Sequence, residues 1–187
     1  MAVLFIVFLP YSWNLLKRSG TPFLIDYDYI SQGLPYYKEF YRLLERGNTA
    51  WSWSELFGNS YYASKGIYLS GDVFAYIGYL LYHYAIHYLP NVLFLITGLK
   101  LLTGGIGFML FLKKHGISDK VSVVFGAGFM ISGWATVFSE QIWFISFYVW
   151  IPYFLLGAEK IIRHESRVLF VLASVLILCS NLYLAWS

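Results

Sequence analysis

Residues 92–112 read VLFLITGLKLLTGGIGFMLFL, an apolar run interrupted by a single charge, Lys100. A helix that crosses the hydrocarbon core of a bilayer needs about 20 predominantly apolar residues. This run is therefore long enough to span a membrane. Similar runs lie at 1–16, 121–138, 142–158 and 168–187. The sequence thus predicts an all-α polytopic membrane protein with about five transmembrane helices.

Composition supports this class. Hydrophobic residues make up 59% of the chain and charged residues 12%, whereas a soluble domain is typically about a quarter charged. Aromatic residues reach 21%, which suits a protein with many helix ends at the lipid headgroups. The net charge of +3 is small and scattered, so nucleic acid is not an expected partner. Cys179 is the one cysteine, which excludes a disulfide within this chain.

The long connection 17–91 carries helices of its own. Tyr37, Phe40, Tyr41 and Leu44 recur at helical spacing, which predicts an amphipathic helix over 36–46 lying flat on the outer leaflet. The apolar but tyrosine-rich segment 73–89 predicts an interfacial or re-entrant helix, with a full span as the weaker alternative. Between them, Trp51 and Trp53 stand in a turn-rich stretch from which they could dock onto the membrane.

Short basic loops predict the orientation. One loop carries Lys113, Lys114 and Lys120, and the other carries Lys160, Arg163 and Arg167. Because short basic loops stay in the cytoplasm, the N-terminus is predicted to be cytoplasmic and 17–91 extracytoplasmic.

The two ends of the sequence suggest a longer protein. Residues 1–16 have no basic start and no cleavage site after them, which favours an uncleaved first span over a signal peptide. The apolar run 168–187 stops without a flanking charge. We therefore expect the chain to be the N-terminal part of a longer membrane protein.

Acidic residues near the predicted outer face are candidates for chemistry. Asp26 and Asp28 follow the first span, with Gln32 close behind, and Glu140 lies in the shortest outer turn. One Asp could act as a general base toward a hydroxyl. Together with Glu140, the pair could hold a divalent cation such as Mg2+ or Mn2+. The alternative is that Asp26 and Asp28 are solvated acids of a polar loop and that Glu140 is an ordinary helix-end residue.

Other features have both a functional and a structural interpretation. Lys100 is the only charge well inside a predicted span, so it could bind a lipid phosphate or extend its ammonium to the interface. His83 and His87 are spaced to share a helix face and bind a metal, although an ordinary interfacial position is the stronger interpretation. Several glycines of the spans are expected to let helices approach closely: Gly98, Gly104, Gly105, Gly107, Gly126, Gly128 and Gly133.

The order of these features resembles the N-terminal part of the bacterial membrane protein YfhO family, within the GT-C group of membrane glycosyltransferases. The resemblance rests on short stretches that follow one another along nearly the whole chain. They are Asp28–Tyr36, the helix 37–44, Trp51-Ser-Trp53, Phe57-Gly58-Asn59, Leu99-Lys100-Leu101, Lys113-Lys114, Ile131-Ser132-Gly133, Pro152 before Gly157-Ala-Glu159, and Ser180–Tyr183. One departure is Gly33, where the family usually has an aromatic residue.

The resemblance implies a function. It implies transfer of a sugar, with inversion, from a polyprenyl-phosphate donor to a cell-surface glycan such as lipoteichoic acid, on the outer face of the bacterial cytoplasmic membrane. Asp28 would be the general base. Asp26, Gln32 and Glu140 would position acceptor, donor or metal, and Lys100 would neutralise the lipid-phosphate leaving group.

Two other classes of function stay open at this point. A transporter or lipid flippase would use Lys100 and the glycine-rich spans as a moving pathway, although no internal repeat is visible. A non-catalytic assembly partner would use the aromatic outer loop to dock another enzyme.

Overall fold

The computed structural model describes residues 29–48, 50–53, 58–61, 64, 66–138 and 141–181. Several predicted features lie outside these residues. They are the span 1–16, the acids Asp26, Asp28 and Glu140, and the end of the span 168–187.

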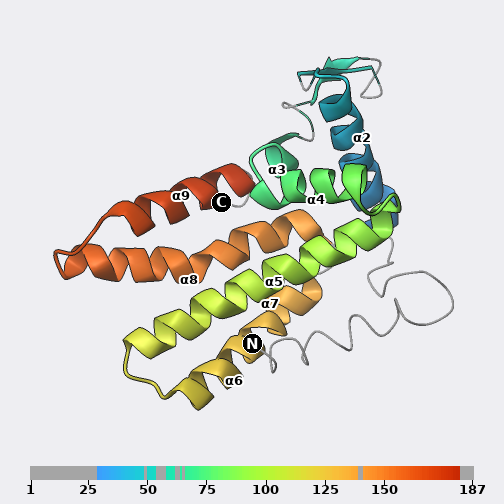
Figure 1. Cartoon of the computed structure of the whole chain (residues 1–187). Coiled ribbons are helices and arrows are strands. Elements are labelled where there is room, and N and C mark those ends of the chain that lie inside the picture. The colour runs from blue at the N-terminus through green and yellow to red at the C-terminus, as the bar shows by residue number, and fades with distance from the viewer. Residues whose placement is uncertain are drawn as a thin grey trace, which may run out of the picture.

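Helices dominate the described chain, so the predicted all-α class is confirmed (Figure 1). The elements are η1 (Tyr29–Gly33), α2 (Leu34–Glu45), β1 (Trp51–Ser52), β2 (Asn59–Ser60), α3 (Ile67–Leu69), α4 (Val73–Tyr84), α5 (Leu89–Lys114), α6 (Asp119–Met130), α7 (Gly133–Val137), α8 (Ile142–Ile162) and α9 (Val168–Ser180). The strands β1 and β2 form a small antiparallel hairpin in which Trp51 pairs with Ser60.

Three segments are long and apolar enough to cross a membrane: α5, the broken segment α6–α7, and α8. They correspond to the runs at 92–112, 121–138 and 142–158. The described part of the last run forms the shorter apolar helix α9. Figure 1 shows α5 and α8 side by side, with α6–α7 against α5 and α9 against α8.

The segment 119–137 is broken between α6 and α7, at Ile131 and Ser132. A break inside an apolar segment leaves backbone groups that need partners. Ser132 accepts a hydrogen bond from the backbone of Ala135, and Tyr148 of α8 donates to the carbonyl of Phe129 at 2.9 Å. The Tyr148 hydroxyl also bonds the Ser132 hydroxyl at 2.7 Å. Side chains therefore satisfy the polar groups at the break.

Glycines allow α5 and α6 to touch through their backbones. A Cβ atom on Gly105 would lie 2.9 Å from the Gly126 carbonyl oxygen, and one on Gly126 would lie 2.8 Å from the Gly105 carbonyl oxygen. These are distances that real Cβ atoms do not show, so both positions need glycine. This pair has the close-packing role that the sequence predicted for it, whereas Gly128 and Gly133 face open space.

The amphipathic helix α2 begins with Pro35 in its first turn and is followed by Gly47, whose φ is +64°. Its apolar face is buried inside the protein. Phe40 stacks on Tyr61 and meets Tyr76 of α4 edge to face. The expectation that this face lies on lipid is therefore wrong, because α4 and Tyr61 provide an aromatic surface that covers it.

Helix α4 runs antiparallel to α5. Asp72, just before α4, pairs with Lys100, whereas Gly78 lies against Ile96, nearer the start of α5. Because α4 is joined to α5 by a short connection, the two form a helical hairpin whose far tip is the turn before Val73. The re-entrant interpretation of 73–89 stays a prediction.

Candidate functional site

The candidate site is a charged junction enclosed between α4, α5 and α8. Lys100 is fully buried, with none of its surface exposed. Its ammonium donates to Asp72 Oδ2 at 2.6 Å, to Ser146 Oγ at 2.6 Å and to the carbonyl of Ile142 at 3.0 Å. An ammonium has three N–H groups, so these three acceptors use all of them.

Asp72 balances this charge and also caps a helix. Its Oδ1 accepts from the backbone N–H of Phe74 at 3.0 Å, which satisfies one of the free donors at the start of α4. Its Oδ2 accepts from Lys100 and, at 2.8 Å, from the Ser146 hydroxyl. Asp72 has no exposed surface. The cap and the ion pair therefore share one enclosed carboxylate.

The turn that carries Asp72 is inserted tightly into the helix bundle. A Cβ atom on Gly71 would overlap the backbone carbonyl of Cys179 near the end of α9. On the same side, the buried Asn181 side chain donates to the carbonyl of Trp143 at 3.2 Å. The ends of α4, α8 and α9 thus meet around the Asp72 turn, and their polar groups bond to one another.

The junction lies deep in the bundle. Lys100 comes eleven residues after Leu89, the first residue of α5. At the α-helical rise this is roughly 17 Å along the helix axis. In a bilayer, irregular backbone at such depth is tolerated only where protein surrounds it, and the pairing of Asp72 with Lys100 meets this condition for the turn before α4.

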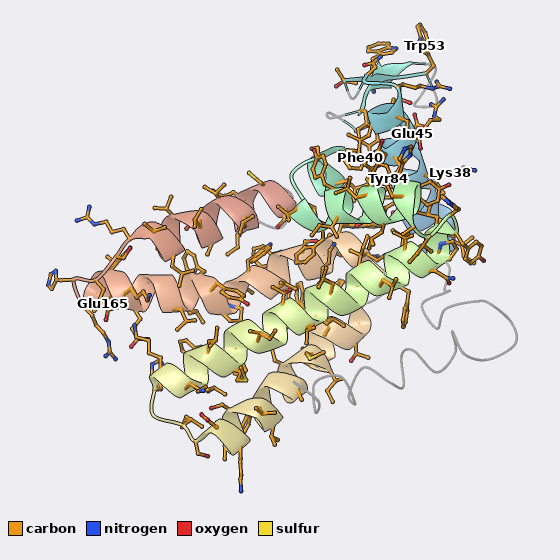
Figure 2. All side chains as sticks on the ribbon, in the orientation of Figure 1. Lys38, Phe40, Glu45, Trp53, Tyr84 and Glu165 are labelled. Carbon is orange, nitrogen blue, oxygen red and sulfur yellow. The ribbon has the colours of Figure 1, made fainter. Side chains whose placement is uncertain are left out.

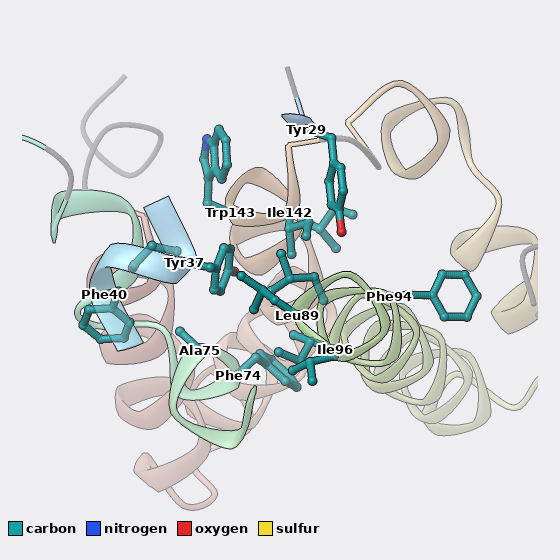
Figure 3. Packing of buried hydrophobic residues seen from close by; sticks show 14 of the residues in the cluster. Tyr29, Tyr37, Phe40, Phe74, Ala75, Leu89, Phe94, Ile96, Ile142 and Trp143 are labelled. Carbon is teal, nitrogen blue, oxygen red and sulfur yellow. The ribbon is translucent and has the colours of Figure 1, made fainter. Parts of the chain in front are cut away.

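A layer of tyrosines from α2 covers the junction. The Tyr37 hydroxyl lies 3.5 Å from the Lys100 ammonium, and Tyr41 packs against Gly78. Figure 3 shows Tyr37, Leu89 and Ile142 among the residues of the buried cluster. Burial, and then the charge of Asp72, raise the pKa of Tyr37 and of Tyr41. Both hydroxyls therefore stay protonated at neutral pH.

Elements η1 and α2 pack onto the start of α8. Tyr36 stacks on Trp143 with ring centroids 5.6 Å apart, and Tyr29 is fully buried. A Cβ atom on Gly33 would lie 3.8 Å from the Trp143 ring, which is an ordinary van der Waals distance. Gln32, predicted as a positioning residue, is half-buried.

Of the predicted site residues, Lys100 and Gln32 lie in the described chain. The role of Lys100 in binding lipid phosphate stays a prediction, because in this structure protein groups occupy all three of its donors. No cluster of three or more metal-binding side chains occurs among the described residues. The predicted metal ligands Asp26, Asp28 and Glu140 lie outside that part of the chain.

The histidine pair does not form a metal-binding face. Helix α4 ends at Tyr84, so His87 lies beyond the helix that holds His83. The spacing of four residues therefore does not place the two imidazoles on one helix face, because only His83 lies in the helix. His83 instead lies 3.7 Å from Glu45 at the protein surface.

Asp72 and Ser146 are the residues that sequence reasoning missed. One signal was present: Asp72 directly precedes an apolar helix, which is a typical N-cap position. A second was the isolated Lys100, which requires an anionic partner at its own depth. Nothing in the sequence connects these two signals across 28 positions.

A helical membrane protein with a buried ion pair at the tip of a helical hairpin is the class that this fold and site define. The chain belongs to the family described as "Bacterial membrane protein YfhO", whose model matches residues 1–187. No curated protein and no solved structure matches the chain.

Proposed function

We propose that this protein is a membrane glycosyltransferase. It moves a sugar from a polyprenyl-phosphate donor to a cell-surface polymer, such as lipoteichoic acid or another exported glycan, on the outer face of the membrane. The proposal builds on membership of the YfhO family and on the resemblance of this family to the GT-C glycosyltransferases.

One observation carries the proposal within this chain. The stack of Tyr36 on Trp143 joins the segment that follows Asp28 to the segment that follows Glu140. Tyr29, the neighbour of Asp28 in sequence, is buried at the same end of the bundle. A fixed contact between these segments supports a common site for the predicted acids.

The proposed reaction needs a base and a stabilised leaving group. Asp28 takes the proton of an acceptor hydroxyl, whose oxygen attacks the anomeric carbon of the donor sugar. The bond from that carbon to the phosphate oxygen breaks, the configuration inverts, and the lipid phosphate leaves with its negative charge. Asp26, Gln32 and Glu140 hold the acceptor, the donor or a divalent cation.

In this proposal Lys100 neutralises the leaving phosphate. Its ammonium is paired with Asp72 in the described structure. The role therefore requires the hairpin tip to withdraw so that phosphate replaces Asp72 as the counter-ion.

The test is the Asp28→Asn variant of the full-length protein, expressed in a strain that lacks the wild-type copy. We expect the surface polymer to lose its sugar, because an amide cannot accept the proton. Lys38→Gln, a change on the exposed side of α2, serves as the control and should leave the polymer decorated. Normal decoration by an Asp28→Asn protein that reaches the membrane in normal amounts would show that Asp28 is not the base.

A transporter or lipid flippase is the second candidate. The broken segment α6–α7 and the re-entrant tip with its buried charges favour it, because transporters place broken helices and ion pairs at mid-membrane depth. Transport by reconstituted vesicles that is unchanged in Asp28→Asn would support this candidate over the glycosyltransferase.

A further inference from the structure

The hairpin β1–β2 exposes two tryptophans at the end of α2 farthest from the helix bundle. The exposed fraction is 42% for Trp51 and 78% for Trp53. Figure 2 shows Trp53 at the tip, beyond Glu45 and well away from the spanning helices. A contiguous exposed apolar surface is typical of a site that binds a protein or a membrane.

The two rings are held in place. Their centroids are 5.8 Å apart in an edge-to-face arrangement. Both rings lie over Gly58, whose φ is +105°, and a Cβ atom there would come within 2.8 Å of the Trp53 ring and 3.1 Å of the Trp51 ring. Glycine is required at this position for its backbone conformation and for the space that the rings need.

The hairpin is also fixed to α2. Ser52 is buried and its hydroxyl bonds the Glu39 carboxylate. The same carboxylate forms a two-point pair with Arg42, at 2.8 Å from Nε and 2.6 Å from Nη2. Since α2 packs its aromatic face on Tyr61 and α4, the tryptophans have a defined position relative to the spanning helices.

That position is beside the bundle rather than beyond it. In Figure 1, α5 and α8 run in a common direction, whereas α2 leaves the start of α5 sideways and carries the hairpin at its far end. If α5 and α8 cross a bilayer, an element that leaves sideways at their ends stays near the level of the headgroups. Tryptophan is enriched at that level, since its ring is apolar and its N–H can bond water or lipid.

Helix α4 adds a matching surface. Its exposed residues Val73, Tyr76, Leu80 and Tyr84 recur at helical spacing and so follow one side of the helix. The opposite side of α4 is buried, with Phe74, Ala75 and Gly78 in the core. An apolar surface of this kind, in a protein with spanning helices, is suited to lipid.

We propose that Trp51 and Trp53 insert into the headgroup region of the bilayer at the α5 N-terminal end and anchor the α2 hairpin there. The occupant of this surface is phospholipid, and the hairpin is a second membrane attachment outside the spanning helices. This inference is independent of the proposed enzymatic activity.

Spin labelling of the full chain in nanodiscs of phosphatidylethanolamine and phosphatidylglycerol tests the proposal. A label on Trp53→Cys, in a Cys179→Ser background, is compared with labels on Lys38→Cys and Val124→Cys. Lys38 is on the exposed side of α2, and Val124 is an exposed apolar residue of α6. We expect the collision rate of label 53 with oxygen, relative to a water-soluble nickel chelate, to lie between the two references.

Each other outcome overturns the proposal. Accessibility equal to that of Lys38 would put the tip in water, as expected for a surface reserved for a glycan or a protein. Accessibility equal to that of Val124 would put it in the hydrocarbon.

A second measurement keeps both tryptophan positions aromatic. Brominated lipids should quench the fluorescence of the wild-type chain more than that of Trp51→Phe/Trp53→Phe, since the double variant keeps the other five tryptophans but lacks the two indoles of the hairpin. Equal quenchable intensity in the two proteins would count against insertion.

Discussion

At the scale of single residues, Lys100 shows how a spanning helix carries a charge without lipid or water around it. Its partner Asp72 comes from another helix and is equally buried. Taking two charges out of water is costly, and their attraction offsets that cost only when each retains its partner. Removing one member should therefore harm the fold more than removing both.

The first prediction is a double-mutant cycle on this pair. Lys100→Met and Asp72→Asn should each lower the free energy of unfolding by about 3–5 kcal/mol, because each leaves one buried charge unpaired. Asparagine still caps α4, so Asp72→Asn isolates the loss of charge. The double variant should lose much less than the sum, as measured by thermal unfolding in detergent.

An exposed pair provides the control for this cycle. Lys113 and Asp119 lie 3.0 Å apart at the protein surface, where such pairs contribute about 0–1 kcal/mol. Lys113→Met should therefore change stability little. Additive losses in the Lys100 and Asp72 double variant would contradict the idea that each charge is present to neutralise the other.

At the scale of elements, packing between α5 and α6 depends on two facing glycines. A Cβ atom added to either glycine would lie against the carbonyl oxygen of the other. In lipid, association of helices relies on close van der Waals contact rather than on the hydrophobic effect. A single methyl group at this contact must therefore separate the helices or distort them.

The second prediction compares two glycines of α6. Gly126→Ala should lower the free energy of unfolding by about 1–3 kcal/mol, because the methyl group overfills a packed contact. Gly128→Ala should be neutral or stabilising by up to about 1 kcal/mol, since nothing lies near that position and alanine favours helix. Thermal unfolding of both variants in the same detergent measures the difference. Equal losses of stability in Gly126→Ala and Gly128→Ala would refute the packing argument.

At the scale of the whole molecule, charge is distributed unevenly along the bundle. The loops that follow α5 and α8 lie at one end of the bundle. Six bases lie in these loops or in the helix turns next to them: Lys113, Lys114, Lys120, Lys160, Arg163 and Arg167. Polar contacts join these loops to each other and to the helix ends. Lys114 Nζ lies 3.7 Å from the Glu165 carboxylate, and His115 Nε2 lies 3.6 Å from the Glu159 carboxylate. The turn before α4 and the tryptophan hairpin lie away from that end of the bundle.

The third prediction concerns orientation. In cells that express single-cysteine variants in a Cys179→Ser background, a membrane-impermeant maleimide should label Lys38→Cys from outside. Lys120→Cys should react only after the membrane is opened, because short basic loops stay in the cytoplasm. Both positions are exposed in the structure, so a difference in labelling reports the side of the membrane. If Lys120→Cys were labelled from outside and Lys38→Cys only after the membrane is opened, the orientation would be the reverse of the proposed one.

Local patterns in the sequence determined a large part of this fold. Hydropathy predicted the apolar runs that became α5, α6–α7 and α8, and helical spacing predicted α2 together with its buried residues Tyr37 and Phe40. These features could be predicted because each depends on residues within a few helical turns.

The tertiary structure alone decided the site. It paired Lys100 with Asp72, which the sequence presents as one acid among several in a long loop, and it added Ser146 from a third helix. It also covered the apolar face of α2 with α4 rather than with lipid. The physical reason is that a buried charge or an apolar face requires a partner, and the sequence shows this requirement. The identity of the partner depends on which distant segments the packed helices bring to the same depth.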